Sequence, residues 1–159
     1  MFKIHKEYPN GGKVLIHKTI NKKGSDYKPL VNIANFFAKE GRTTKLMPTL
    51  HFKSEEYKEI FSSLIGTIYE RKCPDLQIDG QFYEFENYNP PFKIRKISNM
   101  ISHGAKQSPR IIINNTKGAS DRYIRRQISE RLDDKHFKYK IDKVWVYEKG
   151  KLRLLFKIQ

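Results

Sequence analysis

The chain begins and ends with segments in which apolar and polar residues alternate. In FKIHKEYPNGGKVLIHKTI (2–20), alternating runs lie on either side of a glycine-containing turn at residues 10–12. KVWVYEKGKLRLLFKI (143–158) has the same two-run character. Alternation on both sides of a tight turn is typical of a β-hairpin whose strands each bury one face. We therefore expect a hairpin at each end of the chain.

Other segments have apolar residues at a spacing of three and four, which predicts amphipathic helices. They are YKPLVNIANFFAKE (27–40), FKIRKISNMISHGAKQ (92–107) and the segment after Ser120, with a shorter helix expected from Glu55 to Ile65. The apolar stripes of the three longer helices are Leu30, Ile33, Ala34 and Phe37; Ile94, Ile97 and Ile101; and Ile124, Ile128 and Leu132. The expected N-caps are Ser25 or Asp26, Ser54, and Ser120 or Asp121.

The middle of the chain supplies further strands. RTTKLMPTL (42–50) suggests one strand, and the apolar run RIIIN (110–114) is bounded by turn residues in the manner of a buried strand. CPDLQIDGQFYEFENY (73–88) contains two short runs around Asp79-Gly80, a strong hairpin signal. This order of elements predicts a mixed α/β (α+β) fold, with a central sheet flanked by helices. We expect a hairpin extension at 1–24 and one α/β domain at 25–159.

The hairpin expected at 73–88 also carries three carboxylates. If Asp79-Gly80 is a two-residue turn, Asp75 lies opposite Glu84. Glu86 shares their face, because side chains alternate along a strand. The other face can fill a core with Leu76, Ile78, Tyr83 and Phe85.

Acids that close together need an explanation. Directly opposed side chains have Cβ atoms about 4.5–5.5 Å apart, so like charges repel unless a cation lies between them or one takes a proton. A divalent metal such as Mg²⁺, bound by Asp75 and Glu84, is one solution. A carboxylate general base, Glu84 or Glu86, is a second. A solvated strand face whose acids pair with lysines is the third, and the residues alone leave all three open.

The helix predicted after this hairpin has a polar side. Lys96, Asn99, His103, and Lys106 or Gln107 recur at three- and four-residue spacing, which places them on one surface of a helix. His103 is suited to proton transfer, and Lys106 is suited to binding a phosphate or stabilising charge in a transition state. The alternative for His103 is an ordinary surface histidine.

The net charge of the chain indicates which kind of binding partner to expect. The 159 residues include 32 Lys and Arg against 17 Asp and Glu, a formal charge of +15 that is spread along the chain. Such a field favours a polyanion, most often nucleic acid. In SDRYIRRQISERL (120–132), four arginines surround an Ile/Leu stripe, and we expect them to contact phosphates: Arg122, Arg125, Arg126 and Arg131. The alternative is that these arginines lie on an ordinary solvent-exposed face of the helix and bind no phosphate.

Composition also excludes some classes of protein. A single cysteine, Cys73, rules out a disulfide framework and is compatible with a reducing compartment. No stretch approaches the roughly 18 apolar residues of a membrane span. The first residues, MFKIHKEYPNGG, have no apolar core of the kind found in a Sec signal.

Several short motifs resemble a known family. They are AKEG (38–41) at a helix end, Pro74-Asp75 before the hairpin, the acidic YEFEN (83–87), AKQ (105–107) at the next helix end, and RIIIN (110–114). Over about Val31 to Val146 they resemble the C-terminal nuclease domain of contact-dependent growth inhibition toxins, the CdiA tRNase group, and the broader PD-(D/E)xK nuclease pattern. The resemblance implies a nuclease-like α-β-β-β-α-β core with hairpins at both ends.

The resemblance also implies roles for individual residues. Asp75 and Glu84 match the two acids that bind metal in the PD-(D/E)xK pattern. Glu86 occupies the position of the pattern's lysine, so this chain departs from it, and Lys106 on the following helix is the substitute we name. The tRNase group also includes metal-independent members. The resemblance of this chain to those members implies that Glu84 or Glu86 is the base and that His103 or Lys106 is the acid or the phosphate ligand. The nucleophile would be the RNA 2′-hydroxyl.

Three functions follow as alternatives. The first is a nuclease that cleaves tRNA or other structured RNA, and the second is a metal-dependent DNA endonuclease. The third is a catalytically inactive nucleic-acid-binding module on the same scaffold, which Glu86 in place of lysine favours. For a toxin-like nuclease, the resemblance implies a cytoplasmic site of action, delivery by a route other than Sec, and an acidic immunity protein as inhibitor.

Overall fold

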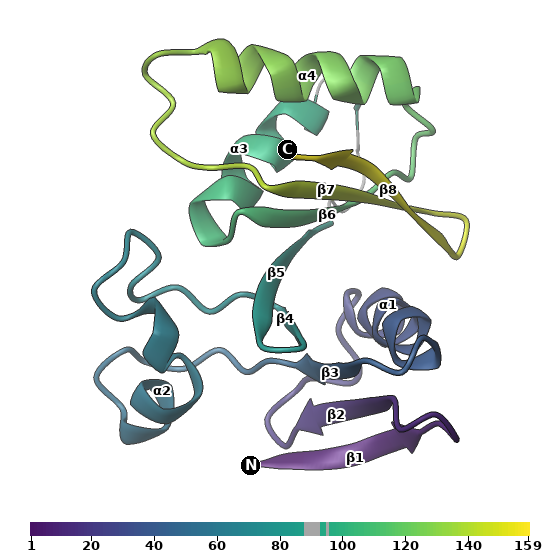
Figure 1. The fold of residues 1–159 in the computed structure, drawn as a ribbon, viewed down its shortest axis with the longest axis vertical. Coiled ribbons are helices and arrows are strands. Elements are labelled where there is room, and N and C mark those ends of the chain that lie inside the picture. The colour runs from purple at the N-terminus through teal and green to yellow at the C-terminus, as the bar shows by residue number, and fades with distance from the viewer. Residues whose placement is uncertain (88–92, 95) are drawn as a thin grey trace. The chain divides into compact units, whose positions relative to one another are not determined.

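A computed structural model describes residues 1–87, 93–94 and 96–159 of the chain. These residues form two compact units, unit 1 (Met1–Phe82) and unit 2 (Tyr83–Gln159). Figure 1 follows the chain through both units, from purple at the N-terminus to yellow at the C-terminus. Each unit combines strands with helices, which confirms the predicted α/β (α+β) class.

Unit 1 is built on four strands in the order β1-β2-β3-β4. β1 and β2 form the predicted N-terminal hairpin, β2 and β3 are parallel, and β3 and β4 are antiparallel. β1 lies at the end of this order, and nearly all of its residues are exposed. The elements are β1 (Phe2–Glu7), β2 (Lys13–His17), α1 (Tyr27–Lys39), β3 (Thr43–Leu46), α2 (Glu55–Ile60), a 3₁₀ turn (Ser62–Leu64) and β4 (Leu76–Ile78).

Helix α1 is the crossover that joins the parallel strands β2 and β3. The helix ends where Gly41 adopts a φ of +88°, a conformation that favours glycine. The hydroxyl of Thr44 in β3 donates to the carbonyl of Ala34 at 3.2 Å and so fixes the helix against the sheet. The buried stripe of α1 is the one predicted from the sequence: Leu30, Ile33, Ala34 and Phe37. In such a unit, ligands bind at the carboxyl ends of the parallel strands.

Unit 2 contains the second set of strands, in the order β5-β6-β7-β8. β5, β6 and β7 are parallel, and β8 returns antiparallel to β7 as the predicted C-terminal hairpin. Helices α3 and α4 are the two crossovers. The elements are β5 (Gln81–Glu86), whose first residues belong to unit 1, α3 (Lys96–Gln107), β6 (Arg110–Asn114), α4 (Asp121–Asp133), β7 (Lys143–Glu148) and β8 (Lys151–Lys157).

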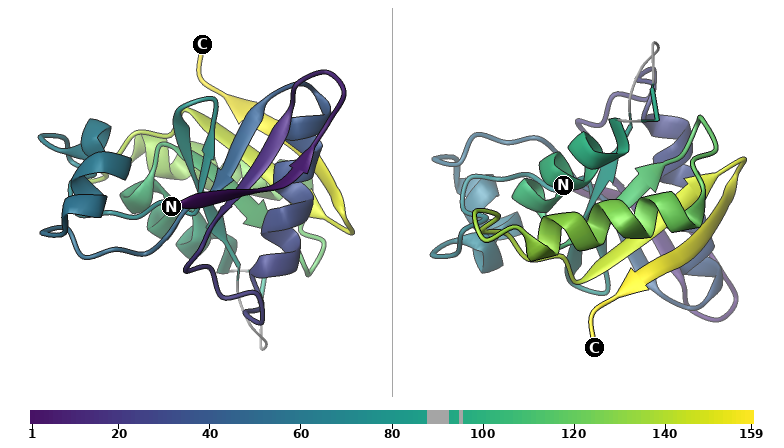
Figure 2. Two further views of the ribbon diagram at one scale, coloured as in Figure 1. Left: turned by 90° about the horizontal axis from the view of Figure 1, so that it is seen from below. Right: turned by 90° about the horizontal axis from the view of Figure 1, so that it is seen from above.

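Both helices of unit 2 cover the same face of its sheet. Ile111 and Ile113 of β6, with Val144 and Val146 of β7, are fully buried in one cluster with residues of α3 and α4. Figure 2 shows α4 lying across the strands of this unit. Burying one such side chain contributes about 1.5–3 kcal/mol, so this cluster is a major source of the stability of unit 2.

The structure corrects three details of the predicted helices. Ile94 precedes α3 and is 45% exposed, whereas Ile97 and Ile101 are buried as predicted. Leu132, in the last turn of α4, is 43% exposed, so the stripe of that helix ends at Ile128. Helix α2 ends at Ile60 because the chain tightens into a 3₁₀ turn instead of continuing to residue 65. Phe92 and Arg95 of the predicted helix 92–107 lie outside the described residues.

The compact units also divide the chain at a different place from the predicted domains. The hairpin expected as an extension at 1–24 is part of the sheet of unit 1, because β2 pairs with β3. The boundary between the units falls between Phe82 and Tyr83, inside strand β5. No glycine, proline or charge run marks that position, so a boundary there has no signal in the sequence.

Candidate functional site

Two of the three predicted carboxylates point to the same face of β5. In the register with β6, Glu84 pairs with Ile111 and Glu86 pairs with Ile113. Residues paired in adjacent strands point to the same side of a sheet, so both carboxylates face the side that α3 and α4 cover. Both are half-buried, and Phe85 between them is buried on the other face, as the alternation predicts.

Helix α3 approaches this face of β5 at Gly104. A β-carbon at Gly104 would lie 3.2 Å from Cγ of Glu86 and 2.8 Å from Cγ2 of Ile111. Gly104 is itself buried. The neighbour of Glu86 is therefore the backbone of α3, and the carboxylate lies at an interface between helix and sheet.

His103 and Lys106 occupy other sides of the same helix. Successive residues are about 100° apart around a helix axis. By that geometry His103 projects about 100° and Lys106 about 200° away from the direction of Gly104. Both side chains are exposed. His103 thus flanks the Glu86 contact and Lys106 lies across the helix from it, so their predicted catalytic roles require a substrate to connect them with the carboxylates.

The remaining polar residues of α3 differ in exposure. Asn99 is exposed, whereas Lys96 and Gln107 are half-buried. Gln107 lies about 60° around the axis from Gly104, nearer to the direction of Glu86 than His103 is. The predicted polar side of α3 exists, and the nucleic-acid contacts assigned to it stay predictions.

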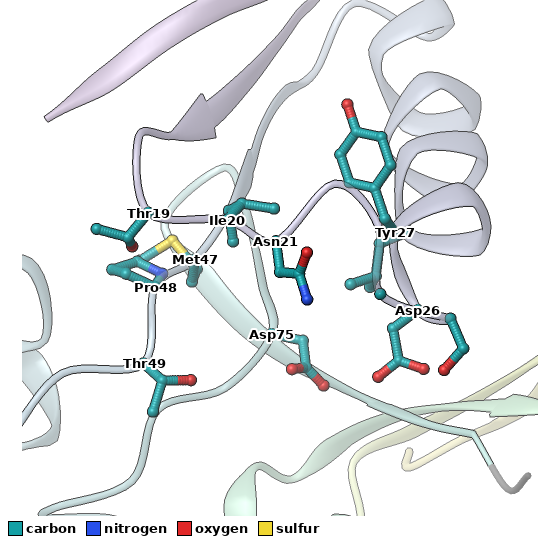
Figure 3. A pocket seen from close by; sticks show the side chains of 12 residues that line it. Thr19, Ile20, Asn21, Asp26, Tyr27, Met47, Pro48, Thr49 and Asp75 are labelled. Carbon is teal, nitrogen blue, oxygen red and sulfur yellow. The ribbon is translucent and has the colours of Figure 1, made fainter.

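The third carboxylate, Asp75, lies in unit 1 just before β4. It lines a pocket of about 410 Å³ at the carboxyl ends of β2 and β3, beside the first turn of α1. Figure 3 shows the side chains of Asn21, Asp26 and Asp75 turned toward this pocket. Asp26 was predicted only as a helix cap, and its side chain makes no capping hydrogen bond. The lining of the pocket therefore includes two carboxylates and an amide.

A metal site shared by Asp75 and Glu84 stays a prediction, because the two residues belong to different units. Within residues 1–87, 93–94 and 96–159, no three His, Cys, Asp or Glu side chains are grouped to hold a metal ion. Asp26, Asp75 and the amide oxygen of Asn21 are oxygen donors of the kind that Mg²⁺ accepts. These three line one pocket and are the candidates of unit 1 to hold such an ion.

Helix α4 carries the predicted phosphate-binding arginines. Arg122, Arg125 and Arg126 are exposed along it. Arg131 is different, because it is half-buried and its guanidinium donates to the hydroxyl of Ser98 in α3. The first three arginines are therefore accessible at the surface, with Arg126 paired to Glu130 at 3.8 Å, and Arg131 joins the two helices. Their contacts with phosphates stay a prediction.

A polar network at the carboxyl ends of β6 and β7 was not identified from the sequence. Asn115 is 2% exposed, and its Nδ2 donates to Glu148 Oε1 at 2.7 Å and to the carbonyl of Ala119 at 2.9 Å. Its Oδ1 accepts from the Ala119 N–H at 2.9 Å. Arg153 donates to Asp121 at 2.7 Å and to Glu148 at 3.3 Å. The hydrogen bond to Asp121 is the main cause that raises the pKa of Arg153.

One signal for this network does exist in the sequence. Asn114-Asn115 directly follows the apolar run of β6, and polar residues at that place lie at the carboxyl edge of a parallel sheet. The partners Glu148 and Arg153 are more than 30 residues away, so only the strand register brings them there.

Comparison of the chain with models of protein families, with curated proteins and with solved structures finds no match. The likeness to the CdiA tRNase group therefore rests on the motifs in the sequence. In the part of the chain that the structure describes, no helix combines the length and the hydrophobicity needed to cross a membrane.

Proposed function

We propose that this protein is an enzyme that cleaves nucleic acid, with tRNA or another structured RNA as substrate. The observation that carries the proposal is the placement of Glu84 and Glu86, half-buried on one face of β5 beside α3. The paired positions of β6 hold Ile111 and Ile113, which are fully buried. A carboxylate in such surroundings loses hydration, and carboxylates at costly positions cluster at functional sites.

Unit 2 also carries the net positive charge that would attract a phosphodiester substrate. Residues 83–159 contain 18 Lys and Arg against eight Asp and Glu, a formal charge of +10. Residues 1–82 contain 14 against nine, a formal charge of +5. Most of the positive field therefore arises in the unit that holds Glu84 and Glu86, and such a field raises the local concentration of a polyanion.

RNA carries its own nucleophile, so the proposed reaction needs only acid and base. Glu84 or Glu86 removes the proton from a ribose 2′-hydroxyl, and O2′ attacks the adjacent phosphorus. The bond from phosphorus to the 5′-oxygen breaks, and that oxygen leaves with a proton from His103. His103 lies on α3, the helix that packs beside the carboxylates of β5. The products are a 2′,3′-cyclic phosphate and a 5′-hydroxyl end.

Two alternatives each have an observation in their favour. A metal-dependent DNA endonuclease is supported by the oxygen donors beside Asp75 in unit 1. A nucleic-acid-binding module without catalysis is supported by Lys106, which projects from the side of α3 opposite Glu86. The endonuclease predicts DNA cleavage that requires a divalent metal, whereas the binding module predicts no cleavage with or without metal.

A cleavage assay with labelled tRNA and labelled duplex DNA, each with and without EDTA, separates the three functions. RNA cleavage that survives EDTA, with cyclic phosphate ends, supports the proposal. Cleavage of DNA that EDTA abolishes supports the endonuclease. Binding of both nucleic acids without cleavage supports the inactive module and refutes the proposal.

Variants of the carboxylates test the site itself. Glu84→Ala and Glu86→Gln are expected to abolish cleavage and to leave salt-dependent RNA binding nearly intact. Asp133→Asn, which removes an exposed carboxylate of the same unit, is the matched control and should cleave normally. Normal cleavage by both Glu84→Ala and Glu86→Gln would show that the catalytic group lies elsewhere.

A toxin-like nuclease also needs an inhibitor in the cell that makes it. The charge of +15 favours a strongly acidic protein in that role, because opposite charge speeds association. Co-expression with the product of an acidic neighbouring reading frame should relieve growth inhibition by this chain.

A further inference from the structure

We propose that the carboxyl edge of the sheet in unit 2 holds a phosphate-binding site, separate from Glu84 and Glu86, that positions the backbone of the nucleic-acid substrate. This inference deepens the proposed function and rests on it for the identity of the ligand. The site, here named the edge cavity, has a volume of about 550 Å³. It is lined by Asn114, Asn115, Thr116, Lys117, Gly118, Glu148 and Lys149.

Two loops that are distant in sequence form the edge cavity. Residues 114–118 lead from the end of β6 toward α4, and residues 148–149 lie where β7 turns into β8. β6 and β7 are parallel neighbours, with Asn114 paired to Tyr147, so both loops leave the sheet at its carboxyl edge. This edge is where α/β sheets bind their ligands.

The floor of the edge cavity is fixed before any ligand arrives. The buried side chain of Asn115 bonds to the backbone of Ala119 and to Glu148. The backbone N–H of Asn115 donates to the carbonyl of Tyr147 at 2.8 Å. The N–H of Gly118 donates to the carbonyl of Asn115 at 3.3 Å and closes the loop. A loop held in this way loses little conformational entropy on binding, which favours affinity.

The acidic groups at the edge cavity already have partners, and both share the single guanidinium of Arg153. Glu148 accepts from both Asn115 and Arg153, and Asp121 is paired with Arg153. Among the described residues, neither Lys117 nor Lys149 lies within ion-pair distance of an acid, and both are exposed at the rim. The cavity thus offers two uncommitted ammonium groups and the hydroxyl of Thr116.

Those groups match a phosphodiester. A lysine ammonium is a compact positive charge with three donors, suited to non-bridging phosphate oxygens, and a threonine hydroxyl adds a neutral donor. Each phosphate bound by a cation releases counterions, so binding falls with salt in proportion to the number of contacts. Two lysine contacts correspond to a change of roughly 1.5 in the slope of log K against log salt.

The test compares the wild-type chain with Lys117→Ala/Lys149→Ala and with the charge-matched control Lys135→Ala/Lys138→Ala, whose lysines are exposed on the segment after α4. Inorganic phosphate is titrated into each protein while backbone amide NMR signals are followed. Binding of a labelled RNA is measured over a range of salt, and RNA cleavage is measured separately. All three proteins should show the same thermal unfolding.

The expected result is saturable shifts of the amide signals of residues 115–118 and 149–150 in the wild type and the control, and their loss in Lys117→Ala/Lys149→Ala. The RNA affinity of that variant should fall about tenfold or more at low salt, and its salt slope should fall by roughly 1.5. If the two double variants show the same phosphate shifts, RNA affinity and salt slope, the edge cavity is not a phosphate site. That result would not count against the proposed RNA cleavage. Phosphate shifts without any RNA cleavage by the wild type support the site and refute the proposed function.

Discussion

Glu86 of β5 and Gly104 of α3 form a contact in which the glycine makes room for the acid. A β-carbon at position 104 would lie 3.2 Å from Cγ of Glu86, and it would also lie 2.8 Å from Cγ2 of the fully buried Ile111. Any side chain there would push α3 away from the sheet. The position of Glu86, one of the two proposed bases, therefore depends on a residue that has no side chain.

Gly104→Ala tests that dependence. Alanine is the better helix former by about 1 kcal/mol, but overpacking against Ile111 typically costs about 1–3 kcal/mol. We expect a net fall in the free energy of unfolding, measured with urea, and a loss of RNA cleavage. Asn99→Ala, on the exposed side of the same helix, is the control and should stay within about 0.5 kcal/mol of the wild type. A stabilised Gly104→Ala protein would contradict the close approach.

Asp79 gives a prediction for acid pH. Its carboxylate accepts from Arg42 Nε at 2.8 Å and from the Thr43 N–H at 2.9 Å, and Arg42 is the main cause that lowers the pKa of Asp79. A lowered pKa means that the stabilisation is complete above the unfolded pKa of about 3.9 and is lost as the pH falls through the folded pKa.

Asp79→Asn should therefore reduce the free energy of unfolding at pH 7 by about 1 kcal/mol or less, because the pair is at the surface. The difference from the wild type should vanish as the pH is lowered from 5 toward 2. Asparagine tolerates the left-handed φ of +47° at this position, so the turn is preserved. Glu40→Gln, another exposed carboxylate of unit 1, serves as control. A difference that grows on acidification would refute the role assigned to Arg42.

The buried amide of Asn115 predicts a large effect on stability. Asn115→Ala removes the side-chain bonds to Ala119 and Glu148 and leaves buried partners unsatisfied, at a cost of about 1–3 kcal/mol for each such group. Chemical denaturation should show a loss of at least about 2 kcal/mol. Thr116→Ala, at the next and exposed position, should be nearly neutral. Near-neutrality of Asn115→Ala would mean that water replaces these bonds.

The two serine caps allow a paired test. Ser54 and Ser120 each accept the N–H of the residue three positions later, at 3.1 Å. Replacing either with alanine should cost about 1 kcal/mol. Ser129→Ala, inside α4 and exposed, removes the same hydroxyl from a place where alanine is the better helix former, so thermal unfolding should show little loss or a small gain. Equal effects at positions 120 and 129 would argue against capping.

The arginines of α4 predict a salt effect that depends on position. Arg122→Ala, Arg125→Ala and Arg126→Ala should each lower the slope of log K against log salt by about 0.7–0.9 if the residue contacts a phosphate. Arg131→Ala should instead reduce stability, because its guanidinium bonds to Ser98. RNA binding in a salt series, together with thermal unfolding, separates the two outcomes. Slopes unchanged in the first three variants would leave α4 as a solvated surface.

Local patterns predicted most of the elements, because each depends on nearby residues. The alternation of Glu84, Phe85 and Glu86 correctly placed both acids on one face, and the caps at Ser54 and Ser120 needed only three residues of context. Spacing along the helix after β5 also correctly grouped its polar residues. It did not show that the helix meets the sheet through Gly104.

Long-range relationships could not be predicted in the same way. Arg153 reaches Asp121 and Glu148 only because β8 returns beside β7, and no local pattern contains that register. Ile94 has the right spacing to continue the stripe of α3, yet it is exposed because the helix begins at Lys96. The division of the chain inside β5 is likewise set by packing and has no local signature.

Strand β1, at the end of the strand order in unit 1, has a consequence for how the protein behaves at high concentration. An outermost strand exposes backbone groups that can recruit the same strand from another molecule and start aggregation. Lys3 and Lys6 on β1 give any such approach a repulsion between like charges. That protection is electrostatic, so it weakens as added electrolyte shortens the screening length. A solution that keeps this chain dispersed is therefore one of low ionic strength.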